Sequence, residues 1–234
     1  MQTNDKVLGV LGGMGPLASA QFMVRLTQLT PAERDQDHLP AILWSDPRVP
    51  DRTADRPVGA ADPLPWLLRG IDGLQQAGCG AIVMPCSTAH RWFDAMQDYA
   101  RVPVIHIVDA TASELHRLGS TGGLIGVMGT QATLTSRLYQ DRLGASGWDC
   151  IVPTPDEMQR LVSPAIALVK VNRAADAYAP LAEVARSLRE RGTHAVVLAC
   201  TETPLGLQAG PPLELPVVDT IDALARAAIA WAKG

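Results

Sequence analysis

One short pattern occurs twice in this chain of 234 residues, and it constrains the fold more than any other feature. Residues 81–86 (AIVMPC) form an apolar run that ends at a cysteine and is followed by polar residues, and residues 195–200 (AVVLAC) repeat the arrangement. A short unbroken apolar run is typical of a parallel strand that is buried on both faces. We therefore expect two buried strands that end at Cys86 and Cys200.

Two further patterns repeat in the same order along the chain. Residues 8–11 (LGVL) match residues 125–128 (IGVM), and the Pro-Val of 103–104 matches that of 216–217. The matched positions are all 113 to 117 residues apart, as a duplicated lobe with loops of drifting length would give. The expected fold class is therefore α/β, with two similar Rossmann-like lobes, each a parallel sheet covered by helices.

We place the lobes at residues 1–119 and 120–234, with the terminal helix able to pack back on the first lobe. We expect a pseudo-two-fold axis to relate them. Ligands bind at the carboxyl ends of parallel strands. The active site is therefore expected in a cleft between the lobes, with Cys86 and Cys200 on opposite sides of it.

Apolar periodicity and turn residues predict the remaining elements. Further strands are expected at residues 6–11, 40–45, 102–107, 123–128, 148–152 and 215–219. Helices are expected at residues 17–29, 62–77, 88–99, 109–118, 131–143, 156–171, 174–191 and 221–233. Residues 46–61 are rich in Pro, Asp and Arg and should form a long loop. Such loops at strand ends often carry function.

Composition narrows the class of protein. The net charge of −4 gives no basic footprint for nucleic acid, and no apolar run is long enough for a membrane span. The polar first residues do not resemble a signal peptide, so we expect a cytoplasmic protein with no membrane partner. Four cysteines in a chain of this size do not form a disulfide framework, so reduced thiols are expected. Cys79 and Cys150 are interpreted as small buried side chains.

Two thiols on opposite sides of a substrate can perform acid–base chemistry. A free thiol has a pKa of about 8.5, and the helix expected after each cysteine would favour the thiolate. One thiolate can remove a proton from a carbon while the opposite thiol returns one to the other face. This would invert a stereocentre without a cofactor. Ser87, Thr88, Thr201 and backbone N–H groups could stabilise the charge that develops on the substrate carboxylate.

Four motifs together resemble the PLP-independent aspartate/glutamate racemase family, and most closely its aspartate racemase branch. They are residues 11–16 (LGGMGP), 50–53 (PDRT), 84–90 (MPCSTAH) and 199–202 (ACTE). The resemblance covers nearly the whole chain. It implies two lobes, one catalytic cysteine in each, no cofactor, an acidic amino acid as substrate and often a homodimer. By this resemblance Cys86 and Cys200 are the two bases, and in related glutamate racemases the N-lobe cysteine acts on the D-enantiomer.

The resemblance also suggests substrate-binding residues. Arg52 would hold a substrate carboxylate, and Lys170 would be a second cationic anchor. Thr130 matches a family position near the substrate, and Glu202 belongs to the second cysteine motif. One departure stands out, because the family's usual Asn after the first cysteine is Ser87 here. This departure affects the expected substrate size or specificity more than the chemistry.

Other interpretations remain open at this point. Residues 13–18 (GMGPLA) fit a dinucleotide fingerprint, but the acidic residue expected at the end of the second strand is not at the usual distance. His90 and His106 could tune a thiolate or could pack and cap. No residues have metal-ligand spacing, so no metal is expected. Maleate isomerase, hydantoin racemase and arylmalonate decarboxylase types are alternatives, as is a catalytically silent protein that binds an acidic metabolite.

Overall fold

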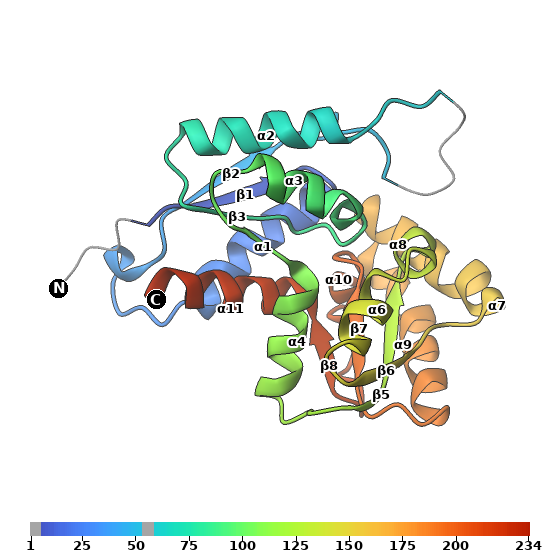
Figure 1. Ribbon diagram of the computed structural model, residues 1–234. Helices are drawn as coiled ribbons and strands as arrows, with labels where there is room; N and C mark the ends of the chain where they lie inside the picture. Colours follow the sequence, from blue (N-terminus) through green and yellow to red (C-terminus); the bar gives the residue numbers. More distant parts are fainter. Residues whose placement is uncertain (1–5, 53–58) are drawn as a thin grey trace. The chain divides into compact units, whose positions relative to one another are not determined.

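The structure is a computed structural model that describes residues 6–52 and 59–234 (Figure 1). The described chain divides into two compact units. The first contains the described part of residues 1–110 together with residues 221–234, and the second contains residues 111–220. This division lies inside helix α4 (Ile107–Arg117) rather than after residue 119, where the sequence placed it. Most of the C-terminal helix α11 (Thr220–Lys233) belongs to the first unit.

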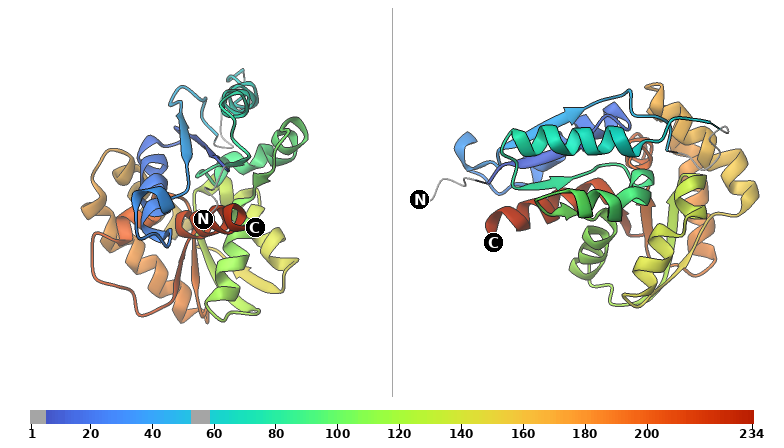
Figure 2. Two further views of the ribbon diagram at one scale, coloured as in Figure 1. Left: turned by 90° about the vertical axis from the view of Figure 1, so that its left-hand side faces the viewer. Right: turned by 45° about the horizontal axis from the view of Figure 1, so that its top comes forward.

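The first unit is built on a four-stranded parallel sheet of order β2-β1-β3-β4. Its strands are β1 (Leu8–Gly12), β2 (Ala41–Ser45), β3 (Ala81–Val83) and β4 (Val104–Ile105). Its helices include α1 (Pro16–Leu29), α2 (Leu64–Gln76) and α3 (Phe93–Tyr99). Helices α1 and α2 cover opposite faces of the sheet (Figures 1 and 2). The sheet is thereby shielded on both sides, as its apolar strands require.

The second unit repeats this topology, with strand order β6-β5-β7-β8 and parallel pairing throughout. Its strands are β5 (Gly123–Gly129), β6 (Trp148–Ile151), β7 (Val196–Ala199) and β8 (Val217–Asp219). Its helices are the rest of α4, then α5 (Gln131–Thr135), α6 (Leu138–Gly144), α7 (Pro155–Glu157), α8 (Ser163–Lys170), α9 (Ala174–Glu190) and α10 (Thr203–Leu207). The expected α/β class with two similar parallel-sheet lobes is therefore confirmed.

Strand register places the two cysteines at equivalent positions. Gly9 pairs with Ile82, four residues before Cys86, and Gly126 pairs with Val196, four residues before Cys200. The strands that follow the cysteines, β4 and β8, are also paired in matching register. The Ile82 N–H donates to the Pro103 carbonyl at 2.9 Å, and the Val196 N–H donates to the Pro216 carbonyl at 2.9 Å. The repeats found in the sequence therefore occupy matching places in the two sheets.

Two expected helices are divided by local backbone geometry. The segment expected at 131–143 breaks into α5 and α6 at Arg137, whose φ of 56° is left-handed. The segment expected at 88–99 begins with a 3-10 turn at Thr88–Trp92 before α3 starts. Neither break has a Gly or Pro to mark it in the sequence, so periodicity alone could not locate it.

A third helix contains an irregular turn with a clear cause. Residues 158–162 are π-helical and lie between α7 and α8. Pro164 lies two residues after this turn, and its nitrogen has no hydrogen to donate to the preceding turn. At the start of α4, Asp109 lies within the first turn, and the imidazole of His106 accepts the Val108 N–H at 3.0 Å.

None of the helices in the described chain is both long and apolar enough to span a membrane.

Candidate active site

Most of the predicted residues of the first unit follow the carboxyl ends of its strands. Arg52 lies in the loop after β2, and Cys86, Ser87 and Thr88 follow β3. Because parallel strands end at one edge of a sheet, these residues lie at the edge where α/β proteins bind ligands. Thr53, the last residue of the 50–53 motif, lies outside the described residues.

Cys86 lies in a tight turn between β3 and the following 3-10 helix. Its N–H donates to the Met84 carbonyl at 2.8 Å, and only 5% of the residue is exposed. Ser87 and Thr88 are buried with it. The polar residues that follow Cys86 in the sequence therefore do not form a solvent-exposed turn. The hydroxyl-bearing residues Ser87 and Thr88 are buried where the 3-10 helix begins.

His90 has a structural role that the sequence left open. Its Nδ1 lies 2.9 Å from the Cys86 carbonyl oxygen, and its Nε2 accepts the Ile107 N–H at 3.1 Å. The ring is buried and packs edge-on against His106, with 4.9 Å between the ring centroids. His90 thus contacts the main chain at Cys86 and at the first residue of α4.

Arg52 is held by backbone carbonyls. Its guanidinium donates to the carbonyls of Met14 at 3.2 Å, Pro50 at 3.3 Å and Val49 at 3.4 Å. Its Nε is buried and has no hydrogen-bond partner among the described residues. A buried donor without a partner is rare in folded proteins. A carboxylate would satisfy it in the geometry that guanidinium groups favour.

The glycine-rich turn after β1 packs directly on the start of the Arg52 loop. Gly13 has a φ of +92°, and a Cβ at this position would lie 2.4 Å from the backbone of Asp46. The buried hydroxyl of Ser19 accepts the Gly13 N–H at 2.9 Å and donates to the Gly15 carbonyl at 2.9 Å. The glycine therefore allows two strand-end loops to touch, with the Met14 carbonyl between them available to Arg52.

The second unit presents its predicted residues at the corresponding sheet edge. Thr130 follows β5 and caps α5, where its hydroxyl accepts the Thr133 N–H at 3.2 Å. Cys200, Thr201 and Glu202 follow β7 and are buried. Lys170 ends α8 and is exposed, and its charge acts on the Cys200 thiol.

The Cys200 thiol lies beside a buried carboxylate. Its Sγ donates to Glu202 Oε2 at 3.1 Å, and the Thr201 hydroxyl donates to the same oxygen at 3.3 Å. Burial raises the pKa of the Cys200 thiol well above its ordinary value, the Glu202 carboxylate raises it further, and the positive charge of Lys170 lowers it. For Cys200, burial and Glu202 therefore outweigh the helix-terminus effect expected from the sequence. Glu202, predicted to bind substrate, contacts the thiol here.

The other two thiols are in unreactive surroundings. Burial raises the pKa of Cys79, and burial together with the charge of Asp149 raises the pKa of Cys150 to about 11. All four cysteines are free thiols. Among residues 6–52 and 59–234, no cluster of three His, Cys, Asp or Glu side chains could hold a metal ion.

Comparison with known proteins places the chain in a family. A sequence model described as Asp/Glu/Hydantoin racemase matches residues 11–228. The chain belongs to this family. The expected resemblance and the isomerase class are therefore confirmed at the level of the Asp/Glu/Hydantoin racemase family.

Individual relatives cover almost the whole chain. The broad specificity amino-acid racemase RacX of Bacillus subtilis (strain 168) is 26% identical over 227 residues, which cover 95% of this chain and 96% of that protein. The structure of Picrophilus torridus aspartate racemase has a TM-score of 0.84 at 33% identity and covers 97% of this chain and 94% of its own. The fold is shared with a glutamate racemase from Francisella tularensis subsp. tularensis SCHU S4 in complex with D-glutamate, with a TM-score of 0.65, 16% identity and coverage of 97% and 81%.

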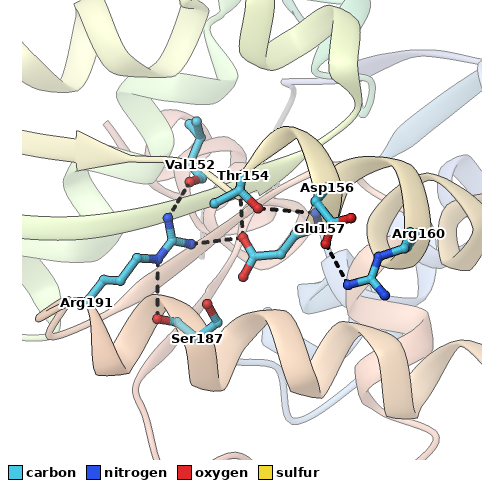
Figure 3. Close-up of polar contacts among 7 residues, drawn as sticks. All are labelled: Val152, Thr154, Asp156, Glu157, Arg160, Ser187 and Arg191. Carbon is cyan, nitrogen blue, oxygen red and sulfur yellow. Dashed lines mark hydrogen bonds and ion pairs between the residues drawn. The ribbon is translucent and has the colours of Figure 1, made fainter.

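A polar network that sequence reasoning missed fixes the start of the helical stretch that ends at Lys170 in this family member (Figure 3). The Thr154 hydroxyl accepts the Glu157 N–H at 3.2 Å, and Glu157 accepts the Thr154 N–H at 2.6 Å, which is a capping box. Arg191 donates to Glu157 at 3.2 Å and to the Val152 carbonyl at 3.1 Å. The Thr-x-x-Glu spacing at 154–157 was the sequence signal for this cap.

Glu157 is charged in this network. Burial raises the pKa of its carboxyl, but hydrogen bonds from Ser187 and Thr154 and the charge of Arg191 outweigh that effect, so the net pKa lies below its usual value. The helical stretch from α7 to α8 is therefore tied to the end of β6 and to the C-terminal end of α9.

Proposed function

We propose that this protein is a cofactor-independent racemase of an acidic amino acid, with aspartate as the preferred substrate, and that Cys86 and Cys200 are its two bases. The observation that carries the proposal is the strand register. Each cysteine lies four residues after a strand residue that pairs with Gly9 or Gly126, in two sheets of the same topology. Matching positions in two units of the same topology suit a pair of bases that share one reaction, whereas buried structural thiols have no reason to repeat in this way.

The proposed reaction is a proton transfer at Cα. One cysteine, as thiolate, removes the α-proton, and the electron pair of the Cα–H bond moves into the substrate carboxylate. The electron pair then returns from the carboxylate to Cα and forms a new C–H bond with the proton of the other cysteine, on the opposite face, which leaves that cysteine as the thiolate. The two cysteines exchange protonation states, so no electron acceptor or cofactor is required. This chemistry requires the thiols to reach opposite faces of the substrate.

Charged and polar groups in each unit support binding of an acidic amino acid. The unsatisfied Arg52 Nε is suited to a carboxylate, and Lys170 supplies a second positive charge. We assign hydrogen bonding of the substrate to Ser87, Thr88, Thr130 and Thr201, which all follow strand ends. Glu202 keeps Cys200 protonated until that thiol donates its proton. Donors aimed at the developing carboxylate charge would contribute most of the stabilisation.

The relatives favour aspartate but also support a broader range. The aspartate racemase from Picrophilus torridus is 33% identical to this chain, and the Bacillus subtilis relative is named as a broad specificity enzyme. Ser87 is shorter than the family's usual Asn, which would leave space for a longer or different side chain. Glutamate is the second substrate that we propose. We further propose that the enzyme acts as a homodimer in the cytoplasm.

The direct test is racemisation of L- and D-aspartate without added PLP, followed by chiral chromatography. Cys86→Ala and Cys200→Ala should each lower the rate by about 10³-fold or more, because each removes one partner of the proton transfer. Cys150→Ala is the matched control and should keep full activity. If either single variant of the pair kept near-full activity, the two-base assignment would be wrong. Binding of aspartate without exchange of its α-proton would instead indicate a binding protein.

A further inference from the structure

We propose that His90 is a positioning residue, which fixes the main chain at Cys86 to the first turn of α4 through one defined tautomer of its imidazole. The tautomer follows from the contacts alone, and only its catalytic consequence rests on the proposed racemase function. The sequence offered tuning of the thiolate or packing as roles for His90, and the geometry points to neither of these alone.

The two contacts of the ring have opposite polarity. The Ile107 N–H can only donate, so the Nε2 atom 3.1 Å away must present its lone pair. The Cys86 carbonyl can only accept, so the Nδ1 atom 2.9 Å away must carry the hydrogen. Both requirements are met by the neutral imidazole with its hydrogen on Nδ1. The imidazolium would place an N–H against the Ile107 N–H and would lose this contact.

The surroundings hold the ring in place. His90 is 2% exposed, and its ring lies parallel to that of Phe93 within 8°, with 6.2 Å between centroids. His106 packs against both rings and accepts the Val108 N–H at 3.0 Å. Two neighbouring imidazoles therefore accept the first two N–H groups of α4, which have no partner within the helix. These contacts fix the orientation that His90 needs to reach Cys86.

The second unit anchors its cysteine and the start of α11 with two threonine hydroxyls instead of one imidazole. The Cys200 carbonyl accepts the Thr203 hydroxyl at 2.7 Å. Thr220, the first residue of α11, donates its hydroxyl to the Leu198 carbonyl at 2.8 Å. In the first unit one side chain joins Cys86 to the helix after the last strand, whereas in the second unit these two hydrogen bonds go separately to Cys200 and to Leu198 in β7. In the first unit α4 begins with Ile107, which has no hydroxyl to make the bond that Thr220 makes at the start of α11.

This tie has a consequence for catalysis. Proton transfer to or from Cα depends steeply on the placement of the base, and a shift of about 1 Å can lower the rate about 10²-fold. His90 sets the main-chain position from which the Cys86 side chain extends. Loss of its two hydrogen bonds should therefore slow the proton-transfer step at Cys86 and leave substrate binding by Arg52 unchanged.

The tautomer is tested first, on the unliganded wild-type protein. With ¹⁵N-labelled histidine, the NMR signals assigned to His90 by their absence from His90→Gln should show a protonated Nδ1 and an unprotonated Nε2 at neutral pH. A protonated Nε2, as the other tautomer or as imidazolium, would overturn the proposal. This result does not depend on any enzymatic activity, so it remains decisive if the protein racemises no amino acid.

The catalytic consequence is tested with His90→Phe, which keeps a packed ring but removes both hydrogen bonds. We expect kcat for aspartate to fall about 10²-fold with KM changed less than about twofold. His90→Gln, whose amide offers one donor and one acceptor, should recover part of the loss. His116→Phe, on the exposed side of α4, is the control and should match the wild type. A folded His90→Phe with wild-type kcat would contradict the proposal, as would a His90→Gln no better than His90→Phe.

An isotope effect identifies which step has slowed. The two enantiomers have equal free energy, so any variant must change kcat/KM equally in both directions. We therefore compare α-deuterated D- and L-aspartate. By the family resemblance Cys86 acts on the D-enantiomer, so His90→Phe should increase the deuterium isotope effect for D-aspartate only. Thr203→Val should increase it for L-aspartate. Equal increases for both enantiomers with His90→Phe would mean that His90 is merely structural.

Discussion

The segments around Cys86 and Cys200 share a backbone position but not a chemical environment. Both follow the third strand of a parallel sheet in matching register. Two residues after Cys200 stands Glu202, whose carboxylate accepts a hydrogen bond from the thiol, whereas the residue two after Cys86 is Thr88. The duplicated backbone thus kept its geometry while the side chains around each thiol diverged. Because of this difference, the two proposed bases are not equivalent in their ease of deprotonation in the resting protein.

The different surroundings indicate which of the two thiols carries the proton at the start of the proposed reaction. Burial and Glu202 hold the pKa of Cys200 well above its ordinary value, so this cysteine enters the proposed reaction as the proton donor. In that half of the cycle, Cys86 must then act as the base.

The position directly after the first strand differs between the units in residue type and in backbone conformation. Gly13 has a φ of +92° and touches Asp46, while the matching position of the second unit holds Thr130 in an extended conformation. Gly13→Ala should destabilise the fold by about 3 kcal/mol or more, because strain and a steric clash combine. Gly78→Ala is the control, since Gly78 has a φ of +84° and open space around it, and should cost only about 1–2 kcal/mol. Urea unfolding measures both, and equal losses would refute the close approach.

The two proposed cationic anchors, Arg52 and Lys170, should differ in how much they contribute to substrate binding. Arg52 is held by three carbonyls with a buried Nε, while Lys170 is exposed. Arg52→Lys should raise the KM for aspartate about 10- to 100-fold, because a planar two-pronged contact to a carboxylate is lost. Lys170→Arg should change KM by less than about fivefold, as for other exposed ion pairs. Steady-state kinetics would contradict this assignment if the order were reversed.

Removal of the Glu202 charge should make the surroundings of Cys200 more like those of Cys86, which has a threonine at the corresponding position. Because that carboxylate raises the pKa of Cys200, Glu202→Gln should lower it, and more thiolate is then present at any given pH below that pKa. The rate at which iodoacetamide alkylates Cys200 at pH 8 should rise severalfold, because alkylation requires the thiolate. Mass spectrometry with Thr88→Val as control would show this, and an unchanged rate would mean that burial alone sets the pKa.

The smallest effect concerns the capping box of the second unit (Figure 3). Thr154→Ala removes the hydroxyl that accepts the Glu157 N–H and should lower stability by about 1 kcal/mol. Thr27→Ala, whose hydroxyl bonds back to Met23 within α1, should change stability by only a few tenths of a kcal/mol. Urea titration compares them. A larger loss in Thr27→Ala would argue against the cap as an organising contact.

Much of the fold could be predicted from the sequence because its signals are local. The apolar runs that end at Cys86 and Cys200, together with the repeated Gly-Val and Pro-Val pairs, were enough to predict two equivalent parallel sheets. The breaks within the helices were harder to predict. The left-handed Arg137 depends on packing around the turn, and the π-helical turn before Pro164 depends on how the helix accommodates a missing donor.

The sequence named candidate site residues but did not predict the hydrogen bonds that they make. The sequence predicted Glu202 near the substrate but did not reveal that its carboxylate contacts the Cys200 thiol, because no pattern in one sequence reports which way that side chain turns. Likewise His90 reaches Ile107, which is 17 residues further along the chain, through a contact that only the folded sheet brings about. Long-range hydrogen bonds of this kind are invisible to periodicity.

Deuterium incorporation distinguishes two thiols that act as separate bases from one base that serves both faces of Cα. L-aspartate is incubated with the wild-type protein in D₂O, and both enantiomers are analysed for deuterium at early times. Two bases predict deuterium in the newly formed D-aspartate and almost none in the remaining L-aspartate, because the proton removed and the deuteron returned belong to different thiols. Equal deuterium in both enantiomers would mean that a single base serves both faces, and it would contradict the account.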